Sequence, residues 1–343
     1  MNGSVAIYRD PTKNRRMKVT IDGKEIDVPK GTTILQAARM IGAEVAPPAM
    51  CYYTKLKTSG GYCRTCIVKV TQGSTANPNP MPKPVASCRT EVMDGMVVEN
   101  FTSPEIVEAR KGIVEFLLIN HPLDCPVCDQ AGECKLQDLG YEHGLAESRY
   151  EFERREFERI DIGDKVQLHM NRCILCYRCV KVADQITDNR VHGVINRGDA
   201  AEISTYIEQA IDNEFSGNVI DVCPVGALTD KTFRFKQRVW FTKPMDAHRD
   251  CPTCSGKVRL WIKGEDVLRV TARKDQWGEV EEFICNGCRY DHKKKSDWVV
   301  EGPSPIYRSS VISQNHYTNL NQNKLEQMKQ QSALGFMKID KKP

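Results

Sequence analysis

The sequence lacks membrane-spanning segments and the common nucleotide-binding motifs. Its longest apolar run, 113–119, is interrupted by Glu115 and is far shorter than the ~20 residues that span a bilayer. Residues 1–16 contain no apolar stretch of the kind found in secretory signals. The chain has neither a G-x-G-x-x-G dinucleotide fingerprint nor a G-x4-G-K-[ST] phosphate loop, and its net charge of +4 is too small to indicate nucleic acid or anionic lipid. We therefore expect no substrate site, no nucleic-acid partner and no direct membrane insertion.

Cysteine, in contrast, is abundant, with 15 in 343 residues. In a reducing compartment disulfides are rare, so grouped cysteines there indicate metal or redox chemistry. The fifteen cysteines and one histidine form four groups of four candidate ligands. These groups are Cys51, Cys63, Cys66 and Cys88; His121, Cys125, Cys128 and Cys134; Cys173, Cys176, Cys179 and Cys223; and Cys251, Cys254, Cys285 and Cys288.

The first group has a C-x11-C-x2-C core and a later fourth cysteine, a stretched form of the plant-type [2Fe–2S] spacing. Glycines just before the second cysteine would let backbone N–H groups approach the sulfurs. Alternation over 17–28 around an Asp-Gly turn predicts a hairpin, and Thr32 or Thr33 can cap a helix ending at Gly42. With further strands expected at 67–71 and 96–99, these elements predict an α+β domain of β-grasp type. Ser103 is expected to cap the next helix.

The second group provides three thiolates and one imidazole, which can complete a [4Fe–4S] cluster, although a zinc site with the same four ligands stays open. The third group has the C-x2-C-x2-C run and distant Cys-Pro of bacterial ferredoxins. The second crossed set of a two-cluster ferredoxin would need cysteines at four other positions. Those positions hold Ala183, Asn213, Ser216 and Val219. The sequence therefore predicts a ferredoxin-like unit with a single [4Fe–4S] cluster.

The fourth group consists of two C-x2-C pairs about thirty residues apart. That spacing is typical of a tetrathiolate zinc site, but the four ligands also suit a [4Fe–4S] cluster.

Taken together, the motifs resemble the large iron–sulfur subunit of respiratory complex I, the proton-pumping NADH:quinone oxidoreductase. The segments that carry the resemblance are SGGYCRTC at 59–66, HPLDCPVCDQAGEC at 121–134, NRCILCYRC at 171–179 and DVCPVGAL at 221–228. The likeness covers about residues 17–235.

The resemblance implies a function in electron transfer within the NADH dehydrogenase module. Electrons from a flavin subunit would reach the first group, then the third, then the second, and leave through a ferredoxin-like subunit toward quinone. It also implies other peripheral-arm partners, including the quinone-site subunits, and a peripheral place on the cytoplasmic side of the bacterial inner membrane. The enzyme activity would belong to the whole H⁺-translocating complex.

The sequence departs from that family in two ways. Bacterial members usually continue into a long molybdopterin-oxidoreductase-like domain. We expect a short form in which this domain is absent or cut to a stub, the four-cysteine segment at 244–302. Many members also have a C-x2-C-x3-C motif for an extra cluster, but here Val258 stands at the third cysteine while Cys288 is new. Family descent favours a third [4Fe–4S] cluster at the fourth group, and the paired spacing favours Zn²⁺; we expect iron.

The expected organisation is multidomain α+β. It comprises a β-grasp [2Fe–2S] domain at 1–100, a small helical one-histidine three-cysteine domain at 101–160, a ferredoxin-like domain at 161–243, a four-cysteine domain at 244–302 and an extended polar tail at 303–343. Two alternatives remain. The small diaphorase subunit of an NAD-reducing hydrogenase has the same motifs but usually two complete ferredoxin sets, and a zinc-binding scaffold would fit the last four cysteines and the basic run at 291–295.

Overall fold

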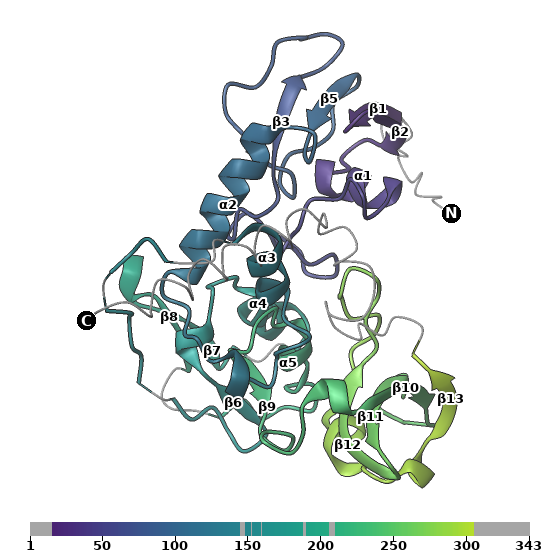
Figure 1. Cartoon of the computed structure of the whole chain (residues 1–343). Coiled ribbons are helices and arrows are strands. Elements are labelled where there is room, and N and C mark those ends of the chain that lie inside the picture. Colours follow the sequence, from purple (N-terminus) through teal and green to yellow (C-terminus); the bar gives the residue numbers. More distant parts are fainter. Residues whose placement is uncertain are drawn as a thin grey trace, which may run out of the picture. The chain divides into compact units, whose positions relative to one another are not determined.

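The computed structural model describes residues 16–144, 148–151, 153–158, 160–187, 190–205 and 210–304 (Figure 1). The chain divides into two units. Unit 1 runs to Asp124 and resumes over Lys135–Lys231, whereas unit 2 contains Cys125–Cys134 and everything from Thr232 onward. No helix in the described ranges is both long enough and apolar enough to cross a membrane. The expected polar tail lies outside the described residues from 305 onward.

Unit 1 begins with the predicted hairpin. β1 (Arg16–Ile21) and β2 (Lys24–Pro29) pair antiparallel across a turn in which Asp22 and Gly23 both have positive φ, as two-residue hairpin turns require. The Asp22 carboxylate also accepts hydrogen bonds from the N–H groups of Asn100 and Phe101, at 2.7 and 3.0 Å. This contact fixes the turn to the segment that follows the last strand of the sheet.

The sheet has five strands in the order β2-β1-β5-β3-β4. β5 (Met96–Glu99) lies parallel to β1, while β3 (Ile67–Gln72) is antiparallel to both β5 and the short β4 (Val85–Ala86). The two strands expected at 67–71 and 96–99 are thus confirmed.

Two helices belong to this part of the chain, and they differ in how well the predicted capping residue at their N-terminus matches the structure. α1 (Ile34–Ile41) has a complete capping box between Thr33 and Gln36, and it ends at Gly42 as expected. α2 (Pro104–Leu118) has Ser103 at the N-cap, as predicted, but the Ser103 side chain makes no capping hydrogen bond. Proline at the first helical position, which needs no N–H partner, remains the start signal there.

The rest of unit 1 consists of short elements around the third cysteine group. α3 (Lys135–His143) contacts α2, and two antiparallel strand pairs follow: β6 (Val166–Leu168) with β9 (Leu228–Asp230), and β7 (His192–Ile195) with β8 (Glu202–Thr205). Two short helices, α4 (Arg178–Gln185) and α5 (Asn218–Val222), contact each other. Each of these helices borders a cysteine motif.

Unit 2 contains a four-stranded antiparallel sheet in the order β12-β11-β10-β13. Its strands are β10 (Lys243–His248), β11 (Val258–Lys263), β12 (Asp266–Ala272) and β13 (Val299–Pro303). The connections β10–β11 and β12–β13 carry the four cysteines of the fourth group, so two separate loops must meet to form that site.

Candidate metal centres

The first cysteine group lies in loops of the five-stranded sheet, and all four of its thiols are buried. Gly60 and Gly61 have φ of +99° and +88°, and a Cβ on Gly60 would come within 2.9 Å of the Cys88 Sγ. The Gly61 N–H donates to that sulfur at 3.3 Å, and the Tyr62 N–H donates to the Cys51 Sγ at 3.3 Å. The glycines therefore allow the backbone to approach the sulfurs, as the sequence predicts.

These N–H donors favour the thiolate form of the buried cysteines. Hydrogen bonds from the thiols of Cys63 and Cys88 lower the pKa of Cys51 below its ordinary value, and the N–H groups of Cys63 and Tyr62 add to the effect. Iron binds thiolate, and N–H···S bonds are a normal part of iron–sulfur sites. The donor set thus fits the predicted [2Fe–2S] cluster.

A buried arginine stabilises the loop that carries this group. Arg110 of α2 is 0% exposed, and its Nε donates to the carbonyl of Thr65 at 3.0 Å. Its NH2 group donates to the carbonyl of Ile67 at 3.1 Å and to the Asn100 side chain at 2.5 Å. Burial lowers the pKa of Arg110 to about 10, which leaves the guanidinium charged at neutral pH.

The third group converges on one cavity. Cys173, Cys176, Cys179 and Cys223 all line it, and the other lining residues are apolar side chains and Tyr177. Burial raises the pKa of all four thiols, that of Cys176 to about 12. Three buried thiols and the half-buried thiol of Cys173 surround an apolar cavity with no acidic residue. This arrangement fits a [4Fe–4S] cluster, whose irons would offset the cost of ionising the sulfurs.

The four positions that would serve a second ferredoxin cluster are filled differently. Ala183, Ser216 and Val219 are buried within the fold, and Asn213 is half-buried. None of these four residues has a thiol, and their side chains contribute to the ordinary packing of the fold.

The structure adds a connection between the first and third groups that the sequence does not indicate. Arg178, between Cys176 and Cys179, is 2% exposed and donates to the carbonyl of Tyr52, beside Cys51, at 2.5 Å. It also donates to the carbonyl of Val222, beside Cys223, at 3.3 Å.

Two aromatic rings make a second bridge between these groups. The rings of Tyr62 and Tyr177, neighbours of Cys63 and Cys176, lie with centroids 4.5 Å apart. The loops of the first and third groups are therefore packed directly against each other within unit 1.

The second group is divided between the two units. Cys125, Cys128 and Cys134 belong to unit 2, where Arg238 donates to the carbonyls of Cys128 and Cys125 at 3.0 and 2.9 Å. His121 belongs to unit 1. The four-ligand set therefore stays a prediction.

His121 itself has the properties of a metal ligand. Its Nδ1 is buried and has no hydrogen-bond partner among the described residues. Burial, followed by the charge of Arg172, lowers the pKa of His121 to about 4, so the ring is neutral at physiological pH. A neutral imidazole with a free nitrogen is the form that binds metals.

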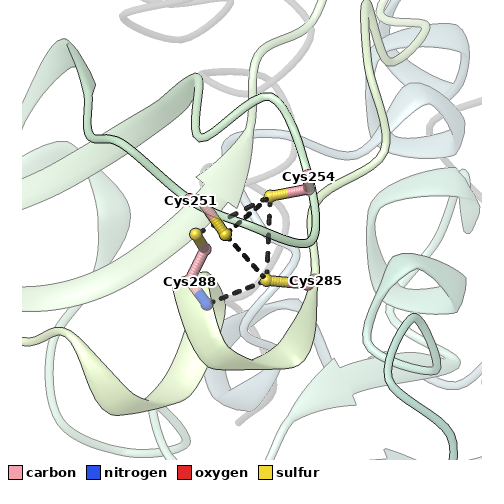
Figure 2. A group of neighbouring side chains, drawn as sticks. All are labelled: Cys251, Cys254, Cys285 and Cys288. Carbon is pink, nitrogen blue, oxygen red and sulfur yellow. Dashed lines mark hydrogen bonds between the residues drawn. The ribbon is translucent and has the colours of Figure 1, made fainter.

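In the fourth group the cysteine side chains of two loops converge on one point (Figure 2). The Sγ atom of Cys254 lies 3.7 Å from each of the other three sulfurs, and all four Sγ atoms lie within 4.8 Å of one another. Cys285 and Cys288 are buried, whereas Cys251 and Cys254 are half-buried. Although burial opposes ionisation, the N–H groups of Thr253 and Cys254 help to lower the pKa of Cys251 to about 6.

Three family models match the segments of the chain that contain the first three cysteine groups. A 2Fe-2S iron–sulfur cluster binding domain matches residues 14–103, the NADH-ubiquinone oxidoreductase-G iron–sulfur binding region matches 110–149, and the ferredoxin-like domain of NADH-quinone oxidoreductase subunit 3 matches 163–229. The chain is thus a mixed α/β iron–sulfur protein with [2Fe–2S] and [4Fe–4S] binding domains.

Similarity to individual proteins shows the family to which the chain belongs. The chain is 40% identical over 274 residues to the NADH-ubiquinone oxidoreductase 75 kDa subunit of Reclinomonas americana, covering 80% of this chain and 38% of that protein. It is 39% identical over 280 residues to an NADH-quinone oxidoreductase subunit of Rickettsia bellii, covering 80% and 39%. The chain belongs to this family of iron–sulfur subunits of NADH-quinone oxidoreductase, and it spans about two fifths of the length of these relatives.

A solved structure is also similar. One chain of an NAD+-reducing [NiFe]-hydrogenase in its H2-reduced state matches with a TM-score of 0.55 and 26% identity, covering 65% of this chain and 91% of that one. The likeness agrees with the motifs that the sequence shares with hydrogenase-associated proteins.

Proposed function

We propose that this chain is the electron-transfer subunit of the NADH dehydrogenase module of respiratory complex I. It would relay single electrons from the flavin subunit toward quinone, and the activity of the H⁺-translocating NADH:quinone oxidoreductase would belong to the assembled complex. The observation that carries this proposal is the packing of the first and third cysteine groups against each other through Arg178 and the Tyr62–Tyr177 pair. Two neighbouring clusters are what a relay needs, whereas a storage or sensing site needs one.

The ligand sets of this proposal are those predicted from the sequence. The residues Cys51, Cys63, Cys66 and Cys88 would hold a [2Fe–2S] cluster. The sets His121, Cys125, Cys128, Cys134 and Cys173, Cys176, Cys179, Cys223 would each hold a [4Fe–4S] cluster. When bound, the clusters supply one-electron redox chemistry, and the protein supplies ligands, N–H···S bonds and nearby cations that adjust their potentials.

The domain boundaries, partners and location are part of the same proposal. We assign a β-grasp domain to 1–100, a one-histidine three-cysteine domain to 101–160, a ferredoxin-like domain to 161–243, a four-cysteine domain to 244–302 and an extended tail to 303–343. Partners would be the flavin- and NADH-binding subunit, a ferredoxin-like subunit and the quinone-site subunits. The complex would lie at the cytoplasmic side of the bacterial inner membrane, with this chain peripheral.

Native purification under anaerobic conditions, with identification of the subunits, tests the proposal. We expect a brown complex that contains a flavin subunit and reduces quinone with NADH. Recovery with nickel–iron hydrogenase subunits would instead support a diaphorase function, which the similarity to the [NiFe]-hydrogenase chain favours as the second candidate. A colourless protein with zinc alone would contradict both and indicate a zinc-binding scaffold.

A further inference from the structure

We propose that Cys251, Cys254, Cys285 and Cys288 hold a single tetrahedral Zn²⁺ ion that stabilises unit 2 and takes no part in electron transfer. The resemblance to the family favours a [4Fe–4S] cluster at this place, and the sulfur positions decide between the two kinds of site. The proposal is independent of the proposed function, because it rests on the geometry of these four residues and of the loops that carry them.

The distances between the sulfurs fit one ion. Four sulfurs at ~2.3 Å from a central Zn²⁺ stand about 3.8 Å apart at the corners of a tetrahedron. The observed separations are 3.7 Å for the pairs Cys251–Cys254, Cys251–Cys285, Cys254–Cys285 and Cys254–Cys288. In a [4Fe–4S] cluster each cysteine binds a different iron, which separates the sulfurs by roughly 6 Å or more. The site is therefore too small for a cubane and matches a mononuclear centre.

The third group provides an internal contrast. Among the described residues, the fourth group is the one set of cysteine, histidine or acidic side chains whose ligand atoms all lie within 4.8 Å of one another. The sulfurs of Cys173, Cys176, Cys179 and Cys223 instead surround a cavity. Within one chain, the sulfurs predicted to hold a cubane surround a cavity, whereas the sulfurs of the fourth group lie close together.

The backbone of each C-x2-C pair turns back onto its own sulfur. The Gly256 N–H donates to the Cys254 Sγ at 3.4 Å, and the Cys288 N–H donates to the Cys285 Sγ at 3.4 Å. Gly256 has φ +67°, and a Cβ there would lie 2.0 Å from the carbonyl oxygen of Arg249. Such tight turns hold both sulfurs of a pair on one side, as a single ion requires.

The sheet leaves the loops little freedom to open. Cys288 is 0% exposed, and Val258 is a fully buried residue of β11. Next to the first pair, Asp246 and Arg259 form a buried ion pair at 3.0 Å between β10 and β11.

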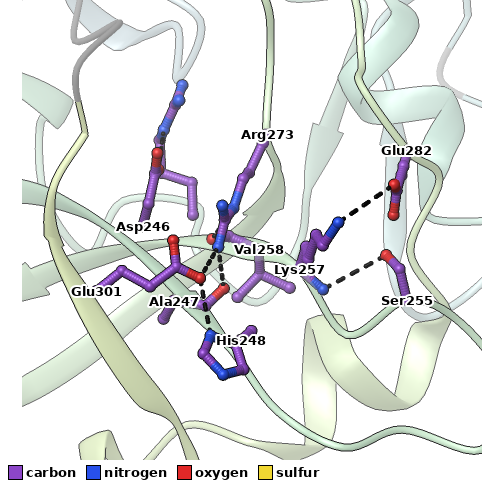
Figure 3. A network of polar contacts seen from close by, with 10 residues as sticks. Asp246, Ala247, His248, Ser255, Lys257, Val258, Arg273, Glu282 and Glu301 are labelled. Atoms are coloured by element: carbon purple, nitrogen blue, oxygen red, sulfur yellow. Dashed lines mark hydrogen bonds and ion pairs between the residues drawn. The ribbon is translucent and has the colours of Figure 1, made fainter.

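Polar contacts at the surface also join the strands and loops of this sheet. Glu301 of β13 contacts both Arg273, at 2.6 Å, and His248, at 2.7 Å (Figure 3). Lys257 lies 3.6 Å from Glu282, which joins the two loops that carry the cysteines. A cubane would require the four sulfurs to move apart, whereas one Zn²⁺ fits their observed positions.

The test compares the zinc and iron content of the intact wild-type complex with that of complexes that carry one of two double variants. We expect Cys254→Ser/Cys288→Ser to lose about one zinc per complex and no iron, and the matched control Cys176→Ser/Cys179→Ser to lose about four irons and no zinc. Loss of about four irons with the first variant would overturn the proposal in favour of a cubane. Loss of about one iron and no zinc would overturn it in favour of mononuclear iron.

A measurement on the unmodified complex covers the case in which the first variant does not assemble. Zinc-edge X-ray absorption of the wild-type complex should show zinc bound by four sulfurs at ~2.3 Å, and cadmium exchange should preserve four-sulfur coordination. Absence of a four-sulfur zinc signal from the wild-type complex would contradict the proposal.

Discussion

Replacing Arg178 by methionine should lower the potentials of both neighbouring clusters. The side chain is buried and bonds to carbonyls beside Cys51 and beside Cys223, so its charge faces both predicted sites. A unit charge ~8 Å from a cluster contributes about 2 kcal/mol at an effective dielectric constant of ~20, which is on the order of 90 mV for a one-electron couple. Because the reduced cluster carries the additional negative charge, the cation favours reduction, and its loss shifts both midpoint potentials downward.

Redox titration of the intact complex, followed by electron paramagnetic resonance, measures both potentials. Arg178→Lys retains the charge and should keep most of each potential, which separates electrostatics from lost packing. Arg190→Met is the matched control, since it removes an exposed arginine paired with Asp184, and its charge is already screened by water. If Arg178→Met kept both clusters and left both potentials at the wild-type values, the electrostatic reasoning would be refuted.

Three further predictions concern other described residues. His121→Cys should retain a [4Fe–4S] cluster but lower its potential, since a thiolate adds negative charge; an unchanged spectrum and potential in His121→Ala would show that this ring is no ligand. Gly60→Ala should lose about two irons, because its Cβ would lie 2.9 Å from the Cys88 Sγ at a φ of +99°; full iron content would contradict this. Arg269→Leu should lower the free energy of unfolding by roughly 3 kcal/mol, since it leaves the half-buried Glu133 without its buried partner at 2.7 Å; hydrogen exchange over 125–134 that matched wild type would argue against it.

The predictable parts of the fold are those that local sequence determines. An Asp-Gly turn between alternating residues specifies the β1–β2 hairpin, and Thr33 with Gln36 specifies the start of α1, because each signal acts within a few residues. The convergence of Cys251 with Cys285 was also predictable. Each C-x2-C pair supplies two of the four ligands that a metal centre needs, so the two pairs are expected to bind one centre together. Ser103 shows the limit of such signals, because a residue of the right type can occupy the cap without bonding.

The contacts that connect the sites were not predictable from local patterns. Arg110 and Arg178 look like ordinary helix arginines in the sequence, yet both are buried and bond to carbonyls more than 40 residues away. The contact of Tyr62 with Tyr177 likewise joins distant loops. Nothing in the spacing of Cys125–Cys134 indicates that this segment associates with the residues after 232. For Arg178, its place between Cys176 and Cys179 is the signal that could have drawn attention to the contact.

The claim that this chain relays electrons is tested most directly by interrupting the third group in the assembled complex. Cys176→Ser removes one of the four thiols around the cavity. With assembly verified, the account predicts loss of the corresponding [4Fe–4S] resonance and of NADH-driven quinone reduction. Reduction of an artificial acceptor at the flavin should continue in the same sample. Undiminished quinone reduction in a complex that has lost this cluster would contradict the account.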